Sequence, residues 1–95
     1  MGSTDPLTRR HLLVRGRVQG VGFRWFARGE AETLGLSGWV RNREDGTVEA
    51  EAEGDAQALT TFVERLRVGC PSARVDSIEE RTSDPRGGRG FEIRR

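Results

Sequence analysis

The order of apolar and polar residues predicts a β-strand over residues 11–18, HLLVRGRV. Alternate residues in this stretch fall on two faces. One face carries Leu12, Val14, Gly16 and Val18, and the other carries Leu13, Arg15 and Arg17. A period of two with apolar residues on one side is typical of a strand that buries one face.

Two later stretches have the period of an α-helix. The apolar residues of the first are Phe23, Phe26, Ala27, Ala31 and Leu34, and those of the second are Leu59, Phe62, Val63 and Leu66. Residues at these spacings form one apolar stripe along a helix. Gly35 and Gly69 follow the stripes where helices commonly end. Asp55 precedes the second stripe and is predicted to cap that helix.

Between the two helices the pattern predicts a β-hairpin with arms at residues 36–42 and 47–53. Asp45 and Gly46 form a dipeptide that is common in hairpin turns. The first arm places Leu36, Gly38, Val40 and Asn42 on one face; the second directs Val48, Ala50 and Ala52 inward and Glu49, Glu51 and Glu53 outward.

Two further strands are predicted at residues 73–81 and 90–95, separated by a loop at 83–88. The order is therefore β-α-β-β-α-β with one extra short strand. Right-handed βαβ crossovers place both helices on the same side of a sheet. We predict an α+β fold: a two-layer ferredoxin-like sandwich in which two helices cover one face of an antiparallel sheet.

Composition narrows the possible functions. The 95 residues suffice for one domain. The 16 basic residues, all arginine, and 15 acidic residues leave a net charge of +1, which gives no strong electrostatic case for binding nucleic acid. No apolar run approaches the ~20 residues of a membrane span. One cysteine and one histidine, Cys70 and His11, are too few for an ordinary zinc site. We expect a cytoplasmic protein that uses no metal and binds no membrane.

The stretch QGVGFR, between the first strand and the first helix, has features of an anion site. Gly20 and Gly22 permit backbone angles at which consecutive N–H groups converge. The helix N-terminus adds unpaired N–H donors. Arg24 carries a planar guanidinium that matches the oxygens of a phosphate. The alternative is a turn whose glycines serve packing, with Arg24 solvated.

Asn42, at the end of the first hairpin arm, is a polar residue at an inward position. It could simply begin the turn, as asparagine often does. Its side-chain amide, which both donates and accepts hydrogen bonds, could instead hold a water molecule.

At these stretches the sequence resembles the acylphosphatase family. The matching motifs are GRVQGVGFR at 16–24, GWVRN at 38–42 and DGTVE at 45–49, and the resemblance extends from about Leu12 to Ile93. One departure is Gly22, which stands where many members have a bulkier residue. Residues 1–10 precede the match, so we predict a flexible segment there and an acylphosphatase-like domain at 11–95.

The resemblance implies that the protein is an enzyme that hydrolyses the carboxyl-phosphate bond of acyl phosphates to a carboxylate and inorganic phosphate. By residue match, Arg24 and Asn42 would be catalytic: Arg24 would bind the phosphoryl group and Asn42 would orient the attacking water. The backbone N–H groups that would bind phosphate belong to Gln19, Gly20, Val21, Gly22, Phe23 and Arg24. The resemblance implies no metal and no cofactor. Inorganic phosphate and sulfate should compete with the substrate. We expect a monomer, and we expect His11 and Cys70 to take no part in catalysis.

Two other functions fit part of the sequence. An RNA-binding module with the same element order is disfavoured, because its third strand should carry stacking aromatic residues, whereas residues 47–53 are acidic. A non-catalytic module that binds anions or acyl phosphates, related to the acylphosphatase-like domain of larger maturation proteins, would have the same loop. Turnover of a simple acyl phosphate distinguishes it from the enzyme.

Overall fold

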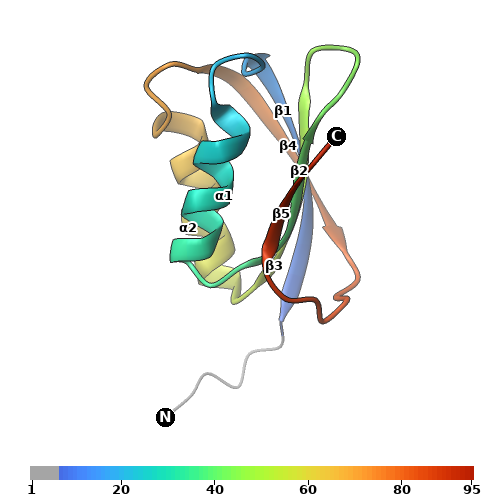
Figure 1. Ribbon diagram of the computed structural model, residues 1–95. Coiled ribbons are helices and arrows are strands. Elements are labelled where there is room, and N and C mark those ends of the chain that lie inside the picture. The colour runs from blue at the N-terminus through green and yellow to red at the C-terminus, as the bar shows by residue number, and fades with distance from the viewer. Residues whose placement is uncertain (1–6) are drawn as a thin grey trace.

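The computed structural model describes residues 7–95, and its seven elements follow the predicted order (Figure 1). They are β1 (Thr8–Arg17), α1 (Phe23–Thr33), β2 (Ser37–Asn42), β3 (Val48–Gly54), α2 (Ala56–Val68), β4 (Arg74–Ser83) and β5 (Phe91–Arg94). β1 begins three residues before the predicted strand, and Thr8–Arg10 pair with β3. These three residues therefore belong to the sheet. Residues 1–6, the greater part of the segment predicted as flexible, lie outside the described residues.

The strands form one sheet in the order β4-β1-β3-β2-β5, and both helices cover the same face of it (Figure 1). This confirms the ferredoxin-like sandwich. The prediction of a purely antiparallel sheet was wrong, because β5 runs parallel to β2. β1 and β2 run in the same direction, because both are antiparallel to β3. β4 is antiparallel to β1, so the chain leaves β4 at the end of the sheet where β1 and β2 begin. The chain must then return in the direction of β2. β1 already has β3 and β4 as neighbours, which leaves the free side of β2 for β5.

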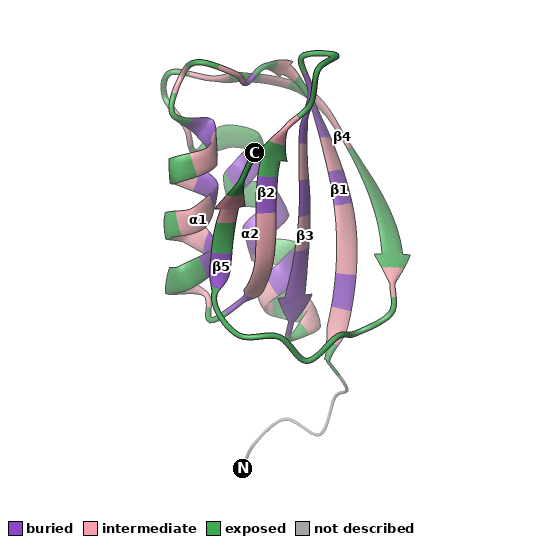
Figure 2. Cartoon of the chain, turned by 45° about the vertical axis from the view of Figure 1, so that its right-hand side comes forward, coloured by how far each residue is buried: buried purple, intermediate pink, exposed green. Residues whose placement is uncertain are grey.

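The core lies between the sheet and the helices, and it contains the residues that the periodicity placed inward (Figure 2). The buried strand residues include Leu12, Val14, Val18, Leu36, Val40, Val48, Ala50 and Ala52. All four apolar residues of the α2 stripe are buried, whereas the α1 stripe is buried at Phe23, Ala27 and Ala31 and half-buried at Phe26 and Leu34. Asp55 caps α2 as predicted, since its side chain accepts a hydrogen bond from the Gln57 N–H at 2.9 Å.

The outer face of the sheet carries ion pairs, and one of its carboxylates is covered. Glu53 points outward as predicted and lies beside Arg9, but it is buried. It accepts hydrogen bonds from the backbone N–H groups of Arg86 (2.6 Å) and Gly87 (2.9 Å), and Arg9 lies 3.3 Å away. The hydrogen bond from Arg86 lowers the pKa of Glu53 despite the opposing effect of burial, and Gly87 and Arg9 act in the same direction. The loop between β4 and β5 therefore covers this carboxylate. The hydrogen bonds to Glu53 fix the path of the loop from β4, at one edge of the sheet, to β5 at the other.

Candidate functional site

The loop between β1 and α1 lies at the same end of the sheet as the turn between β2 and β3 (Figure 1). Gly20 and Gly22 have φ angles of 74° and 79°, in the left-handed region that favours glycine. Gly22 is also the N-cap residue of α1. A side chain at position 22 would be strained in this conformation, which gives a physical reason for glycine where the acylphosphatase pattern commonly has a bulkier residue.

The backbone of this loop presents unused hydrogen-bond donors. The first hydrogen bond of α1 joins the Phe26 N–H to the Gly22 carbonyl at 3.0 Å. Among the described residues, no acceptor is bonded to the backbone N–H groups from Gln19 to Trp25. Gly22 has no side chain with which to cap them. These donors, at the positive end of the α1 dipole, can therefore bind an anion.

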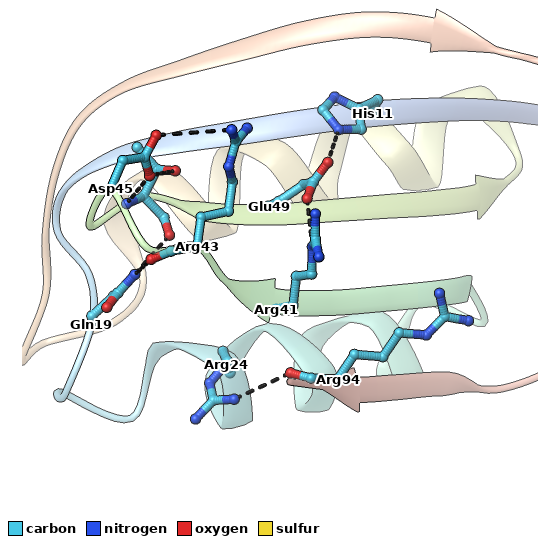
Figure 3. A network of polar contacts seen from close by, with 9 residues as sticks. His11, Gln19, Arg24, Arg41, Arg43, Asp45, Glu49 and Arg94 are labelled. Atoms are coloured by element: carbon cyan, nitrogen blue, oxygen red, sulfur yellow. Dashed lines mark hydrogen bonds and ion pairs between the residues drawn. The ribbon is translucent and has the colours of Figure 1, made fainter.

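Arg24 lies in the first turn of α1 with its side chain half-buried. Its Nη1 donates to the backbone carbonyl of Arg94 in β5 at 3.3 Å (Figure 3). This contact ties the guanidinium to the edge strand and leaves its other N–H groups available. Sequence analysis did not identify the role of Arg94, because the partner is a backbone carbonyl that any residue at this position would supply.

A cavity of about 190 Å³ brings most of the predicted residues together, but Gln19 and Val21 do not line it. It is lined by Val18, Gly20, Gly22, Phe23, Arg24, Trp25 and Asn42. Val18 and Phe23 are buried and close its inner side, while Trp25 is 66% exposed. The loop, the first turn of α1 and the end of β2 therefore meet around one small space.

Asn42 has unused hydrogen-bonding capacity at this cavity. Its Oδ1 is buried, and within residues 7–95 no group donates a hydrogen bond to it. A buried polar atom without a partner costs about 1–3 kcal/mol. The turn does not depend on this side chain. Asp45 is the residue that holds it, since its Oδ1 accepts hydrogen bonds from the Thr47 hydroxyl at 2.6 Å and the Thr47 N–H at 3.0 Å. This arrangement disfavours the interpretation of Asn42 as a turn residue.

The side chain of Gln19 has a role that sequence analysis missed. Its Nε2 donates to the backbone carbonyls of Arg43 at 2.7 Å and Thr47 at 2.9 Å, which joins the loop to the turn that follows Asn42 (Figure 3). Only the backbone N–H of this residue had been assigned. One feature of the sequence could have indicated this role. Gln19 has a long polar side chain, and a loop that binds an anion only through its backbone N–H groups does not need a polar side chain.

A second, wider cavity of about 560 Å³ shares Asn42 with the first. Arg41, Arg43 and Arg95 line it together with Glu44 and Asp45. The Arg41 Nε lies 2.6 Å from Glu49 Oε1, and the Arg43 Nη2 lies 4.0 Å from Asp45 Oδ2 (Figure 3). Two of its three cations are thus already paired with carboxylates.

The residues expected to take no part lie elsewhere. His11 is on the outer face of the sheet, where its Nε2 is 2.6 Å from Glu49 Oε2 (Figure 3). Burial raises the pKa of Glu49, but the hydrogen bonds from His11 and Arg41 outweigh it and lower that pKa overall. Cys70 is half-buried. Neither His11 nor Cys70 lines the loop cavity. Residues 7–95 contain no cluster of His, Cys, Asp and Glu that could hold a metal ion. None of their helices is long and apolar enough to cross a membrane.

The chain matches the sequence model of a known protein family. The sequence model of the family Acylphosphatase matches residues 10–93. The chain is 48% identical to an acylphosphatase of Thermococcus kodakarensis over 85 residues, which cover 90% of this chain and 93% of the relative. It is 50% identical to an acylphosphatase of Azoarcus sp. over 91 residues, covering 93% of each.

Solved structures agree with the sequence comparison. The crystal structure of acylphosphatase from Bacillus subtilis matches with a TM-score of 0.88 and 44% identity, covering 95% of this chain and all of that one. A full-length HypF in its phosphate- and nucleotide-bound form matches with a TM-score of 0.85 and 27% identity. The match covers 98% of this chain but only 12% of HypF.

Proposed function

The chain belongs to the acylphosphatase family and is an enzyme with that activity, and we propose that it acts through a cradle of backbone N–H groups, Arg24 and Asn42. The backbone N–H groups from Gln19 to Arg24 and the Arg24 guanidinium bind the phosphoryl group, and Asn42 positions the attacking water. One observation carries the proposal: unpaired N–H groups, a tethered arginine and an asparagine with a free amide oxygen surround the same cavity.

The chemistry of an acyl phosphate makes this small set of groups sufficient. The leaving group is a carboxylate, whose conjugate acid has a pKa near 4 like that of Asp or Glu. It departs without a proton, so no general acid is needed. Phosphoryl transfer is loose, with little bonding to the nucleophile in the transition state. The enzyme must therefore stabilise charge on the phosphoryl oxygens and hold the water in line.

Hydrolysis of the acyl phosphate needs no side chain to take a proton from the water. The water oxygen forms a bond to phosphorus as the bond between phosphorus and the acyl oxygen breaks. The carboxylate keeps the electron pair of the broken bond, and a phosphoryl oxygen takes the proton that the water loses. The products are a carboxylate and inorganic phosphate.

The experiment that tests the function is hydrolysis of acetyl phosphate by the purified chain in the presence of EDTA. We expect turnover that is unchanged by chelation, because neither the proposed groups nor the described residues include a metal site. Activity that is lost in EDTA and restored by magnesium or zinc would contradict this mechanism. Binding of acyl phosphate without turnover would instead support the non-catalytic module, which the relatives of about 50% identity disfavour.

Inorganic phosphate and sulfate should compete with the substrate and stabilise the fold. An anion that binds only the folded state, at ten times its Kd, adds about 1.4 kcal/mol to the free energy of unfolding. For a domain of this size that raises the Tm by roughly 5–10 °C. Steady-state inhibition and thermal unfolding measure the two effects, with chloride at equal ionic strength as the control. An unchanged KM and Tm in phosphate would count against the cradle.

Replacing Gln19 with alanine should lower kcat/KM for acetyl phosphate by about tenfold, since a displacement of the cradle by about 1 Å can cost that much or more. The variant loses both hydrogen bonds to the turn. Gln57→Ala, an exposed glutamine on α2, is the matched control. If the two variants have the same kcat/KM, Gln19 does not position the loop.

We further propose that the enzyme acts as a monomer. Its large exposed apolar side chains in residues 7–95, Leu7, Trp25 and Val68, belong to different parts of the chain. Isolated exposed residues of this kind are normal on a monomer surface. The cytoplasmic location expected from the sequence stays a prediction.

A further inference from the structure

We propose that Trp25 contacts the acyl group of the substrate and gives the enzyme a preference for acyl phosphates with a flat, apolar acyl group. The inference rests on the proposed function, because it takes the phosphoryl group to lie in the loop cavity with Asn42 holding the water. It concerns the part of the substrate that the cradle itself does not bind.

Trp25 combines a large apolar surface with a place at the mouth of the site. It follows Arg24 in α1 and lines the same cavity as Arg24 and Asn42. Its side chain is 66% exposed, although tryptophan is on average among the more buried residue types. The core does not use this ring, and Arg28 lies over one of its faces, so the other apolar face is free to contact a ligand.

The geometry of the reaction places the acyl group on the side of the cavity away from Asn42. In phosphoryl transfer the attacking and leaving oxygens lie roughly in line on opposite sides of phosphorus. A water held by Asn42 approaches from the side of β2. The carboxylate must therefore leave toward the opposite rim.

Trp25 is at that opposite rim because of its position on the helix. Phe23 is buried and faces the sheet. Each residue of an α-helix turns by about 100°, so Trp25 lies about 200° around α1 from Phe23. It therefore lies on the part of the cavity rim that is farther from the sheet, across from Asn42 in β2, and both residues line the cavity.

The surroundings of the ring leave room for an acyl group and hold the ring in place. Gly20 and Gly22 have no side chains, and a Cβ at either position would meet no atom within 4 Å, so the loop side of the opening is free. The Arg28 guanidinium lies 5.7 Å from the Trp25 ring centroid, close enough for a cation–π contact. An acyl group that leaves over this rim meets one ring whose orientation is already restrained.

The wider cavity offers a second route for the acyl group, but the reaction geometry disfavours it. That cavity shares Asn42 with the loop cavity, so it opens on the side from which the water attacks. A leaving group there would occupy the same side as the nucleophile. The pairing of Arg41 with Glu49 and of Arg43 with Asp45 also reduces the attraction of that cavity for a charged acyl group.

The test compares benzoyl phosphate, which has an aromatic acyl group, with acetyl phosphate, which has a single methyl group. The measured quantity is the selectivity ratio, kcat/KM for benzoyl phosphate divided by kcat/KM for acetyl phosphate. Trp25→Ala should lower this ratio about five- to tenfold, the loss expected for one aromatic contact. Trp25→Phe should retain most of the ratio. Val68→Ala, an exposed apolar residue of α2 that does not line the cavity, should leave it unchanged.

Failure of this inference is distinguishable from failure of the proposed function. If the wild-type enzyme hydrolyses both substrates and the ratio is the same in Trp25→Ala, Trp25 does not contact the acyl group. Equal losses for both substrates would assign Trp25 to the support of the loop and would also overturn the inference. If the wild-type enzyme hydrolyses neither substrate, the proposed function itself is wrong.

Discussion

Replacing Arg24 with alanine is expected to lower kcat/KM for acetyl phosphate by on the order of a thousandfold or more, the range that removal of an arginine at a transferring phosphoryl group gives. Both parameters should change: KM rises because the ground-state phosphoryl group loses a cation, and kcat falls because charge on its oxygens in the transition state loses the same partner. Steady-state kinetics at several substrate concentrations separates the two. Binding of inorganic phosphate, measured by the change in Tm, should weaken in parallel.

Two further variants make the result specific. Arg67→Ala removes an exposed arginine of α2 and changes the net charge equally, so it serves as the matched control. Arg24→Lys should restore little activity, because an ammonium group does not reproduce the planar fork of a guanidinium, which donates to Arg94 and which we propose also binds a phosphoryl oxygen. Wild-type binding and kcat in Arg24→Ala would remove Arg24 from the mechanism.

The fold could be predicted to the extent that local patterns determine it. The inward residues of β3 and the stripe of α2 were identified correctly, since a strand or helix that buries one face must repeat its apolar residues at the period of that element. The direction of β5 and the burial of Glu53 could not be found in this way. Both depend on the loop between β4 and β5, whose Arg86 and Gly87 N–H groups bind a carboxylate more than 30 residues earlier in the chain.

The candidate site has the same division between local and long-range features. The glycines at 20 and 22, the helix start and Arg24 are neighbours in sequence, so a short motif was enough to predict a glycine loop that leads into a helix. The bonds that hold this loop in place join residues that are distant in the chain. Gln19 binds the turn 24 and 28 residues later, and Arg24 binds a carbonyl 70 residues later. Periodicity and turn chemistry carry no information about such pairs, whose geometry follows from the sheet order.

Replacing Asn42 with alanine is expected to lower kcat by on the order of a hundredfold, comparable to losing one preorganised hydrogen-bonding group in other enzymes. The affinity for inorganic phosphate should change little, because the proposed partner of Asn42 is the water and the phosphoryl group is bound by the loop. Kinetics gives kcat, and inhibition by phosphate gives the affinity. A variant that loses ground-state and transition-state binding equally has a higher KM and an unchanged kcat. We expect the opposite pattern for Asn42→Ala, namely a large effect on kcat and a small effect on anion binding.

Stability provides the check that separates catalysis from folding. Within residues 7–95 no group donates a hydrogen bond to the buried Asn42 Oδ1, so its removal breaks no such bond. We therefore expect the free energy of unfolding of Asn42→Ala to be equal to or above that of the wild type. Ser37→Ala, at the opposite end of β2 and outside the loop cavity, is the control for a polar-to-alanine change in the same strand. If Asn42→Ala folds normally but loses phosphate binding, Asn42 contacts the phosphoryl group itself. The water would then need another partner, and the wider cavity that shares Asn42, lined by Arg41, Arg43 and Arg95, is where that partner should be sought.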